Sequence, residues 1–249
     1  KCTYPADLSY NGSDGEDYMY PHPWDDERVY DLKLGGTGIN GDPTGEDYNA
    51  IAELATILHE VSTENLPCEI EQVFDVSYFL KVAALEILVG HWDNYFGNMN
   101  NYYLYERPED GKLMMFSYDV DNTLGVQWWG DYAIQNPFDY SPTDFRPLYD
   151  RLMEVEEYRD ILGAFINAAL EDGFNGPDWA VRGNELIALS TSAALNDTYR
   201  TLDYGFDNND FLQSVSTAWG GHISNGIAPY VLERTNSITS QINLKNQLR

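Results

Sequence analysis

Apolar side chains recur at helical spacing along much of the chain, and the clearest run lies in its first half. Residues 76–89 are apolar at most positions, which predicts a buried helix that Asp75 caps and Gly90 ends. A weaker helical pattern predicts an earlier helix that begins near Thr44 and ends near Val61. The same spacing predicts further helices over roughly residues 146–153, 155–171, 178–195, 208–219 and 226–243.

Two strand-like runs follow the buried helix. Residues 102–105 and 113–118 are rich in aromatic and apolar side chains, and Pro108-Glu109-Asp110-Gly111 between them is typical of a hairpin turn. Val29 to Leu34 alternates in polarity and predicts a short strand. Because the mixed part comes first and helices follow, the pattern predicts an α+β fold. We expect a single domain over residues 1–249, with a mixed part at 1–70, a helix–loop–hairpin core at 71–130 and a helical part at 131–249.

The predicted hairpin also decides where polar side chains meet. The loop before the first strand of an antiparallel pair lies beside the loop after the second strand. Carboxylate and amide side chains occur in both loops, and Trp92 and Tyr95 accompany them. The residues that we expect to converge are Asp93, Asn98, Asn101, Asp119 and Asp121.

Such a set of residues suits phosphoryl transfer. A carboxylate and an amide oxygen can hold Mg²⁺, and a second carboxylate can orient the attacking hydroxyl and accept its proton. Protein kinases carry H-R-D-x-x-x-x-N, then a hairpin, then D-F-G. Here His91-Trp92-Asp93 is followed by Asn98 at the same spacing, then by the hairpin and Asp119. His91 itself is more typical of a packed histidine that supports the loop than of a catalyst.

The charge balance narrows the classes of partner. The chain has 14 Lys and Arg against 41 Asp and Glu, which gives a formal net charge of −27. Nucleic acid and anionic membrane surfaces are therefore excluded as partners, because both require cationic contacts. The excess carboxylate indicates either solubility or the binding of cations at particular clusters. No apolar run is long enough to predict a membrane span.

The two cysteines, Cys2 and Cys68, are too far apart for a C-x-x-C redox or zinc motif. They are candidates for a structural disulfide if the chain is exported, and the alternative is two buried thiols. The run Gly36 to Gly41 reads as G-x-G-x-x-G, but no βαβ unit follows it, so we interpret it as a loop.

Other kinds of site stay open from the residues alone. Asp119 and Asp121 could hold Ca²⁺ in an irregular oxygen cage, although the pattern fails the EF-hand test. Asp93 and the asparagines after it could simply form a capped turn. A carboxylate pair beside aromatic side chains also suits glycoside cleavage or a non-catalytic carbohydrate-binding module. Trp128, Trp129 and Tyr132, with Trp92 and Tyr95, would supply the faces on which a sugar stacks.

Three runs of residues between 75 and 125 together resemble a known family. They read D-V-S-Y-F-L-K-V-A-A-L-E, then W-D-N-Y-x-G-N-x-N-N-Y-Y-L-Y, then S-Y-D-V-D-N-T-L-G. This pattern resembles the spore-coat protein H (CotH) kinase family. The opening Y-P-A-D-L-S-Y-N-G and the closing G-I-A-P-Y-V-L-E-R-T are similar to it more loosely.

The resemblance implies an atypical protein-kinase-like C-lobe, mostly helical, with a small hairpin that carries the active site. It implies transfer of phosphate from ATP to Ser or Thr of extracellular or surface proteins, with Mg²⁺ or Mn²⁺ as the metal. It also implies a secreted or cell-surface location, here in a bacterium. Some members of the family instead act as surface adhesins, so a non-catalytic surface, carbohydrate- or protein-binding module with a structural Ca²⁺ is the alternative.

Carried over to this chain, the resemblance makes Asp93 the catalytic residue and Asp119 a metal ligand, with Asp121 supporting or bridging a second ion. The spacing from Asp93 favours Asn98 as the amide ligand. Asn101 stands just before the strand, as the family's ligand does, and we prefer it for that reason. His91, Trp92 and Tyr95 would line the nucleotide or substrate. The family's phosphate-gripping lysine is expected in a lobe before Lys1, because Lys33 is a poor match; without that lysine the chain as given could be inactive.

Overall fold

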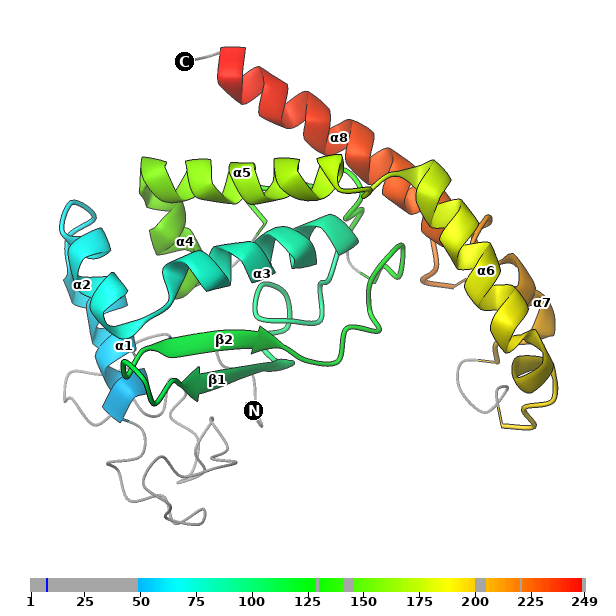
Figure 1. The fold of residues 1–249 in the computed structure, drawn as a ribbon, viewed down its shortest axis with the longest axis horizontal. Coiled ribbons are helices and arrows are strands. Elements are labelled where there is room, and N and C mark those ends of the chain that lie inside the picture. The colour runs from blue at the N-terminus through cyan, green and yellow to red at the C-terminus, as the bar shows by residue number, and fades with distance from the viewer. Residues whose placement is uncertain are drawn as a thin grey trace. The chain divides into compact units, whose positions relative to one another are not determined.

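The computed structural model describes residue 8 and residues 49–128, 130–140, 146–199, 205–219 and 221–247, without the side chains of residues 49, 52 and 243–247. Helices dominate these residues, and the sheet found in them has two antiparallel strands, so the α+β prediction is confirmed (Figure 1). The elements are α1 (Asn49–Glu60), α2 (Leu66–Val73), α3 (Val76–Val89), β1 (Tyr102–Glu106), β2 (Leu113–Ser117), α4 (Pro147–Glu154), α5 (Glu156–Glu171), α6 (Gly176–Leu195), α7 (Asn208–Gln213) and α8 (Ile227–Gln247).

Most element predictions agree with the structure to within a few residues, and two differ. The sequence patterns do not predict α2, because its eight residues bury only Leu66 and Ile70 and give too little period to recognise. The helix predicted over 208–219 ends at Gln213, and residues 214–216 form turns. The strand predicted at 29–34 and the glycine-rich run at 36–41 lie outside the described residues.

The chain forms two compact units that interleave along the sequence. We call residues 1–84, 92–121 and 138–165 the hairpin unit, and residues 85–91, 122–137 and 166–249 the helical unit. The predicted single domain with parts at 1–70, 71–130 and 131–249 stays a prediction. The residues predicted to bind metal or take part in phosphoryl transfer belong to the hairpin unit, apart from His91, whereas Trp128 and Tyr132, predicted to stack on a sugar, belong to the helical unit.

In the hairpin unit, the start of α3 and the hairpin turn are fastened together. Asp75 caps α3 by accepting a hydrogen bond from the Tyr78 backbone at 3.0 Å, as the sequence predicts. Its other carboxylate oxygen accepts from Arg107 at 2.9 Å, and its own N–H donates to the Leu113 carbonyl at 2.9 Å. Arg107 also pairs with Asp110 across the turn, and this ion pair lowers the pKa of Asp110 to about 2.

Aromatic rings form the centre of the hairpin unit. Phe79 on α3 packs edge-on against Tyr95 and at a tilt against Phe96, with both pairs of ring centroids 6.4 Å apart. Tyr95 continues the cluster to Tyr102 on β1, and Phe96 continues it to Tyr149 on α4. The loop between α3 and β1 is therefore anchored in the core by two consecutive aromatic side chains.

In the helical unit, α8 holds the end of α3. Arg234 is fully buried and donates to the Ile87 carbonyl at 3.0 Å and to the Gln135 carbonyl at 2.6 Å. Gly90, which ends α3 at a φ of +69°, leaves room for the Tyr230 hydroxyl, which a Cβ there would meet at 2.2 Å. No described helix is both long enough and apolar enough to cross a membrane.

Candidate functional site

The carboxylate of Asp93 is surrounded by asparagines of its own loop. Asn98 donates its amide to Asp93 Oδ1 at 2.6 Å, and Asn101 donates to Oδ2 at 3.1 Å and to the Asp93 carbonyl at 2.9 Å. With the Asn100 amide nitrogen turned toward Asp93, it also donates to Oδ1 at 3.1 Å. We call this arrangement the amide clamp. It fixes the direction in which the Asp93 carboxylate points.

The chain between Asp93 and Asn98 folds into a tight turn that the sequence specifies. Asn94 is buried, and its side-chain oxygen accepts the N–H groups of Phe96 at 3.0 Å and Gly97 at 3.3 Å. Gly97 is required by close approach, since a Cβ there would lie 1.7 Å from the Trp92 carbonyl oxygen. The turn therefore brings Asn98 back to the carboxylate that precedes it.

The loop that contains Asp93 and the loop that follows β2 meet just beyond the sheet. Strand pairing ends at Tyr102 opposite Ser117, and the next backbone contact is a 2.9 Å hydrogen bond from the Tyr118 N–H to the Asn101 carbonyl. Asn101 and Asp119 flank this contact with φ angles of +52° and +53°. Such left-handed conformations are uncommon outside glycine and often cluster at functional sites.

Asp119 has no polar partner within the described part of the chain, although its neighbours do. The residue is exposed, and its carboxylate makes no hydrogen bond or ion pair there. Because the amides of Asn98 and Asn101 turn their nitrogens to Asp93, their oxygens are left without a hydrogen bond from the described residues. These oxygens and the Asp119 carboxylate are the kinds of ligand that Mg²⁺, Mn²⁺ and Ca²⁺ take.

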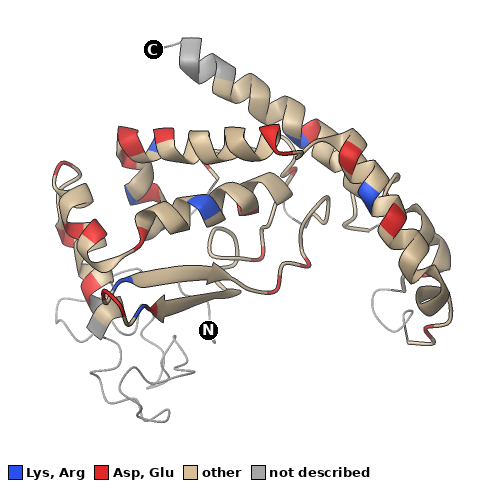
Figure 2. Cartoon of the chain, in the orientation of Figure 1, with Lys and Arg blue, Asp and Glu red and all other residues tan. Residues whose placement is uncertain are grey.

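Asp and Glu residues elsewhere lie at many positions along the helices and loops (Figure 2). Within the described ranges, no three His, Cys, Asp or Glu side chains come close enough together to hold a metal ion. A metal site at the Asp93 loop would therefore depend on asparagine oxygens in addition to carboxylates.

The comparison with known families decides how this loop and hairpin are classified. A family model described as CotH kinase protein matches residues 9–237. The chain belongs to the CotH kinase protein family. Two curated relatives from Rhizopus delemar (strain RA 99-880), Invasin CotH2 and Invasin CotH3, are each 32% identical to it over 127 residues. That alignment covers 49% of this chain and 20% of each relative, so the chain spans about a fifth of the length of these relatives.

The three residues predicted to line the nucleotide or substrate in this CotH-family chain are all buried. His91 is fully buried, and its Nδ1 lies 3.6 Å from Glu86 Oε1, but neither ring nitrogen makes a hydrogen bond with the described residues. Trp92 is 4% exposed and Tyr95 is 1% exposed, with the Tyr95 hydroxyl accepting from the Leu148 backbone at 3.0 Å. Burial gives them a packing role in the loop, and contact with a ligand stays a prediction.

Several residues that shape the CotH-family site escape the sequence analysis. The Asn94-x-x-Gly97 spacing is a turn signal that could have been recognised, because an asparagine oxygen often accepts backbone N–H groups two and three residues later. Arg146 carries no such signal. It lies in sequence far from the loop, yet it donates to the carbonyls of Phe96 and Gly97.

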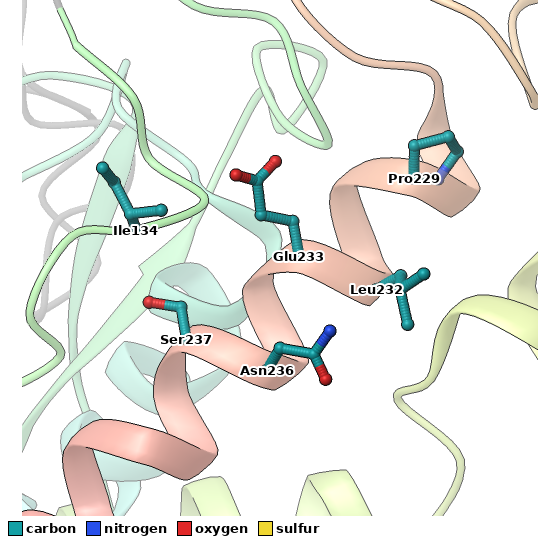
Figure 3. Close-up of a pocket in the computed structure, with 6 residues that line it drawn as sticks. All are labelled: Ile134, Pro229, Leu232, Glu233, Asn236 and Ser237. Atoms are coloured by element: carbon teal, nitrogen blue, oxygen red, sulfur yellow. The ribbon is translucent and has the colours of Figure 1, made fainter.

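Other predicted residues fall outside this site. Cys68 is exposed on α2, and its predicted partner Cys2 lies outside the described residues, as do Trp129 and Lys33. A pocket of about 580 Å³ opens in the helical unit between α8 and Ile134 (Figure 3). Its lining is mainly apolar and holds a single carboxylate, Glu233, so it lacks the paired groups that phosphoryl transfer needs.

Proposed function

We propose that this chain is the catalytic part of a secreted or cell-surface CotH-type protein kinase with an atypical kinase-like C-lobe. It would transfer the γ-phosphoryl group of ATP to a Ser or Thr hydroxyl of an extracellular protein. The observation that supports this most directly is the amide clamp on Asp93, joined to the Asp119 loop through the Tyr118–Asn101 backbone hydrogen bond. Membership of the CotH kinase protein family supports it independently.

Asp93 would orient the acceptor. An ionised carboxylate accepts hydrogen bonds and donates none, so Asp93 would act on the acceptor by accepting from its hydroxyl. A Ser or Thr hydroxyl that donates to Asp93 would be aimed by a carboxylate that cannot rotate. As the hydroxyl oxygen bonds to the γ-phosphorus, the bond from that phosphorus to the β,γ-bridging oxygen breaks, ADP leaves, and the hydroxyl proton passes to Asp93.

The loop after β2, which contains Asp119 and Asp121, would hold the metal. Asp119, with the side-chain oxygen of Asn101 or Asn98, offers the hard oxygen ligands that a divalent cation prefers, and Asp121 would support a second ion. Asp119, Asn98 and Asn101 fit the metal because they have side-chain oxygens that no described residue uses. When bound, Mg²⁺ or Mn²⁺ supplies neutralisation of the charge that develops on the phosphate oxygens.

The test is transfer of labelled phosphate from ATP to the chain itself or to acidic proteins such as casein, with Mn²⁺ present. We expect Asp93→Asn and Asp119→Ala to reduce transfer by at least about 100-fold, which is the contribution typical of a positioned acid–base group. Glu185→Gln is the control, because Glu185 is an exposed α6 residue that pairs with Arg182 on the surface, far in sequence from the Asp93 loop. Transfer that persists unchanged in both aspartate variants would reject the proposal.

A second candidate is a non-catalytic surface-binding module with a structural Ca²⁺. The names of the two curated relatives, both invasins, favour it. Such a module should gain thermal stability from Ca²⁺ without nucleotide, and its binding to a surface should survive Asp93→Asn. A kinase should instead show nucleotide-dependent metal binding that Asp93→Asn leaves intact and Asp119→Ala removes.

A further inference from the structure

Arg146 is buried to an extent that is unusual for an arginine. It stands at the start of α4 with 2% of its surface exposed. Its Nε donates to the Phe96 carbonyl at 2.9 Å and its Nη2 donates to the Gly97 carbonyl at 2.8 Å. Its own N–H donates to Asp150 on the same helix, which fixes the backbone from which the side chain extends.

The first turn of α4 makes further contacts with the same short segment. The N–H of Leu148 donates to the Tyr95 hydroxyl, and the ring of Tyr149 packs against the Phe96 ring with centroids 4.9 Å apart. Residues 95, 96 and 97 are thus each held by α4. We call these residues the held turn.

The held turn lies between Asp93 and the first amide of the clamp. If it shifts, Asn98 moves relative to the carboxylate to which it donates, because only Gly97 separates Asn98 from Phe96. We propose that Arg146 is a positioning residue of the site, which holds the turn in the conformation that the amide clamp needs. The inference rests on the proposed function, since a positioning role has meaning only where Asp93 acts on a substrate.

The guanidinium is suited to this task in a way that other side chains are not. Its planar fork presents two N–H donors to two successive carbonyls in one fixed geometry. A lysine at residue 146 would keep the charge but offer a single point of donation, and a methionine would keep much of the apolar contact and donate nothing. We therefore expect a graded response from arginine to lysine to methionine.

Arg151 provides a matched control on the same helix. It also donates to backbone carbonyls, those of Leu58 and Val61, and its side chain is also largely buried, with 14% exposed. Its carbonyl partners lie at the end of α1 and just after it, not in the held turn. Substitutions at Arg151 thus reproduce the general loss of stability without touching the Asp93 loop.

The experiment compares Arg146→Lys, Arg146→Met, Arg151→Lys and Arg151→Met in the full chain. Steady-state phosphoryl transfer gives kcat and the KM for ATP, and hydrogen exchange followed by mass spectrometry gives the protection of residues 92–101. We expect Arg146→Met to lower kcat about 100-fold and Arg146→Lys to lower it about tenfold, while the KM for ATP of both variants stays within about threefold of the wild type. Both Arg151 variants should keep kcat and KM within about threefold of the wild type. Exchange of the 92–101 segment should rise in the Arg146 variants alone.

Several results would overturn the inference. If Arg146→Met has the same kcat as Arg151→Met and the same exchange protection of residues 92–101, then Arg146 has only a structural role. If Arg146→Met fails to fold, Arg146→Lys decides in the same way. A wild-type chain that binds Mn²⁺ but transfers no phosphate defeats the proposed function, and the exchange comparison then still decides whether Arg146 holds the turn.

Discussion

Gly97→Ala is the smallest change that should disturb the candidate site. The added Cβ would lie 1.7 Å from the Trp92 carbonyl oxygen, whereas ordinary contacts of a Cβ begin at 3.4 Å. The oxygen belongs to the backbone and the Cβ is bonded directly to Cα, so neither atom can rotate away, and the turn itself has to move by about 1.7 Å. Overpacking of this kind costs about 1–3 kcal/mol, which for a domain of this size lowers Tm by about 2–4 °C for each kcal/mol.

The effect on function should exceed the effect on stability. A shift of the turn displaces Asn98 from Asp93, and a misplacement of about 1 Å at a catalytic group can reduce kcat about 100-fold. The assays are thermal unfolding and phosphoryl transfer at saturating ATP. Gly130→Ala is the control, because a Cβ at Gly130 meets nothing within 4 Å and its φ is unremarkable. A Gly97→Ala chain with the Tm and kcat of Gly130→Ala would refute the reasoning.

The remaining predictions concern stability. Asp110 has a pKa of about 2 in the folded chain against 3.8 in an unfolded one, so its pairing with Arg107 stabilises the fold above pH 4, and this stabilisation is lost as the pH falls toward 2. Asp110→Asn should therefore reduce the pH dependence of the free energy of unfolding, measured in urea between pH 5 and pH 2.5. Arg234→Met should cost about 3 kcal/mol in urea unfolding, because it removes the hydrogen bonds from this buried guanidinium to the Ile87 and Gln135 carbonyls; a cost below that of a surface substitution would contradict this. Met99 has a φ of +59°, so Met99→Gly should be more stable than Met99→Ala by about 1 kcal/mol in the same assay, and equal stability of the two variants would count against strain at that residue.

Local patterns predict much of this fold because the residues that make the elements are neighbours in sequence. The apolar run that becomes α3 and the turn at residues 108–111 carry their own period and turn chemistry. Leu66 and Ile70 in α2 show too little period by themselves. Their helix depends on burial against α1, which a local pattern does not contain.

The candidate site is predictable in outline but not in detail. Hairpin geometry alone indicates that the loops of Asp93 and Asp119 approach each other. The choice between Asn98 and Asn101 cannot be made from spacing, since both donate to Asp93 once the turn at Gly97 has formed. The role of Arg146 comes from packing between segments about 50 residues apart, and no local rule reaches that far.

The pairing of Tyr102 with Ser117 sets the position of the Asp93 loop relative to the Asp119 loop. Their meeting point depends on which residues face each other at this end of the ladder and not on how many residues the far turn contains. Lengthening the chain at Gly111, where the surroundings are open, should leave the two acidic loops where they are. A single residue inserted within β2 would instead slip the register and send alternate side chains to the opposite face of the sheet. Tolerance to insertions should therefore differ sharply between two positions only a few residues apart.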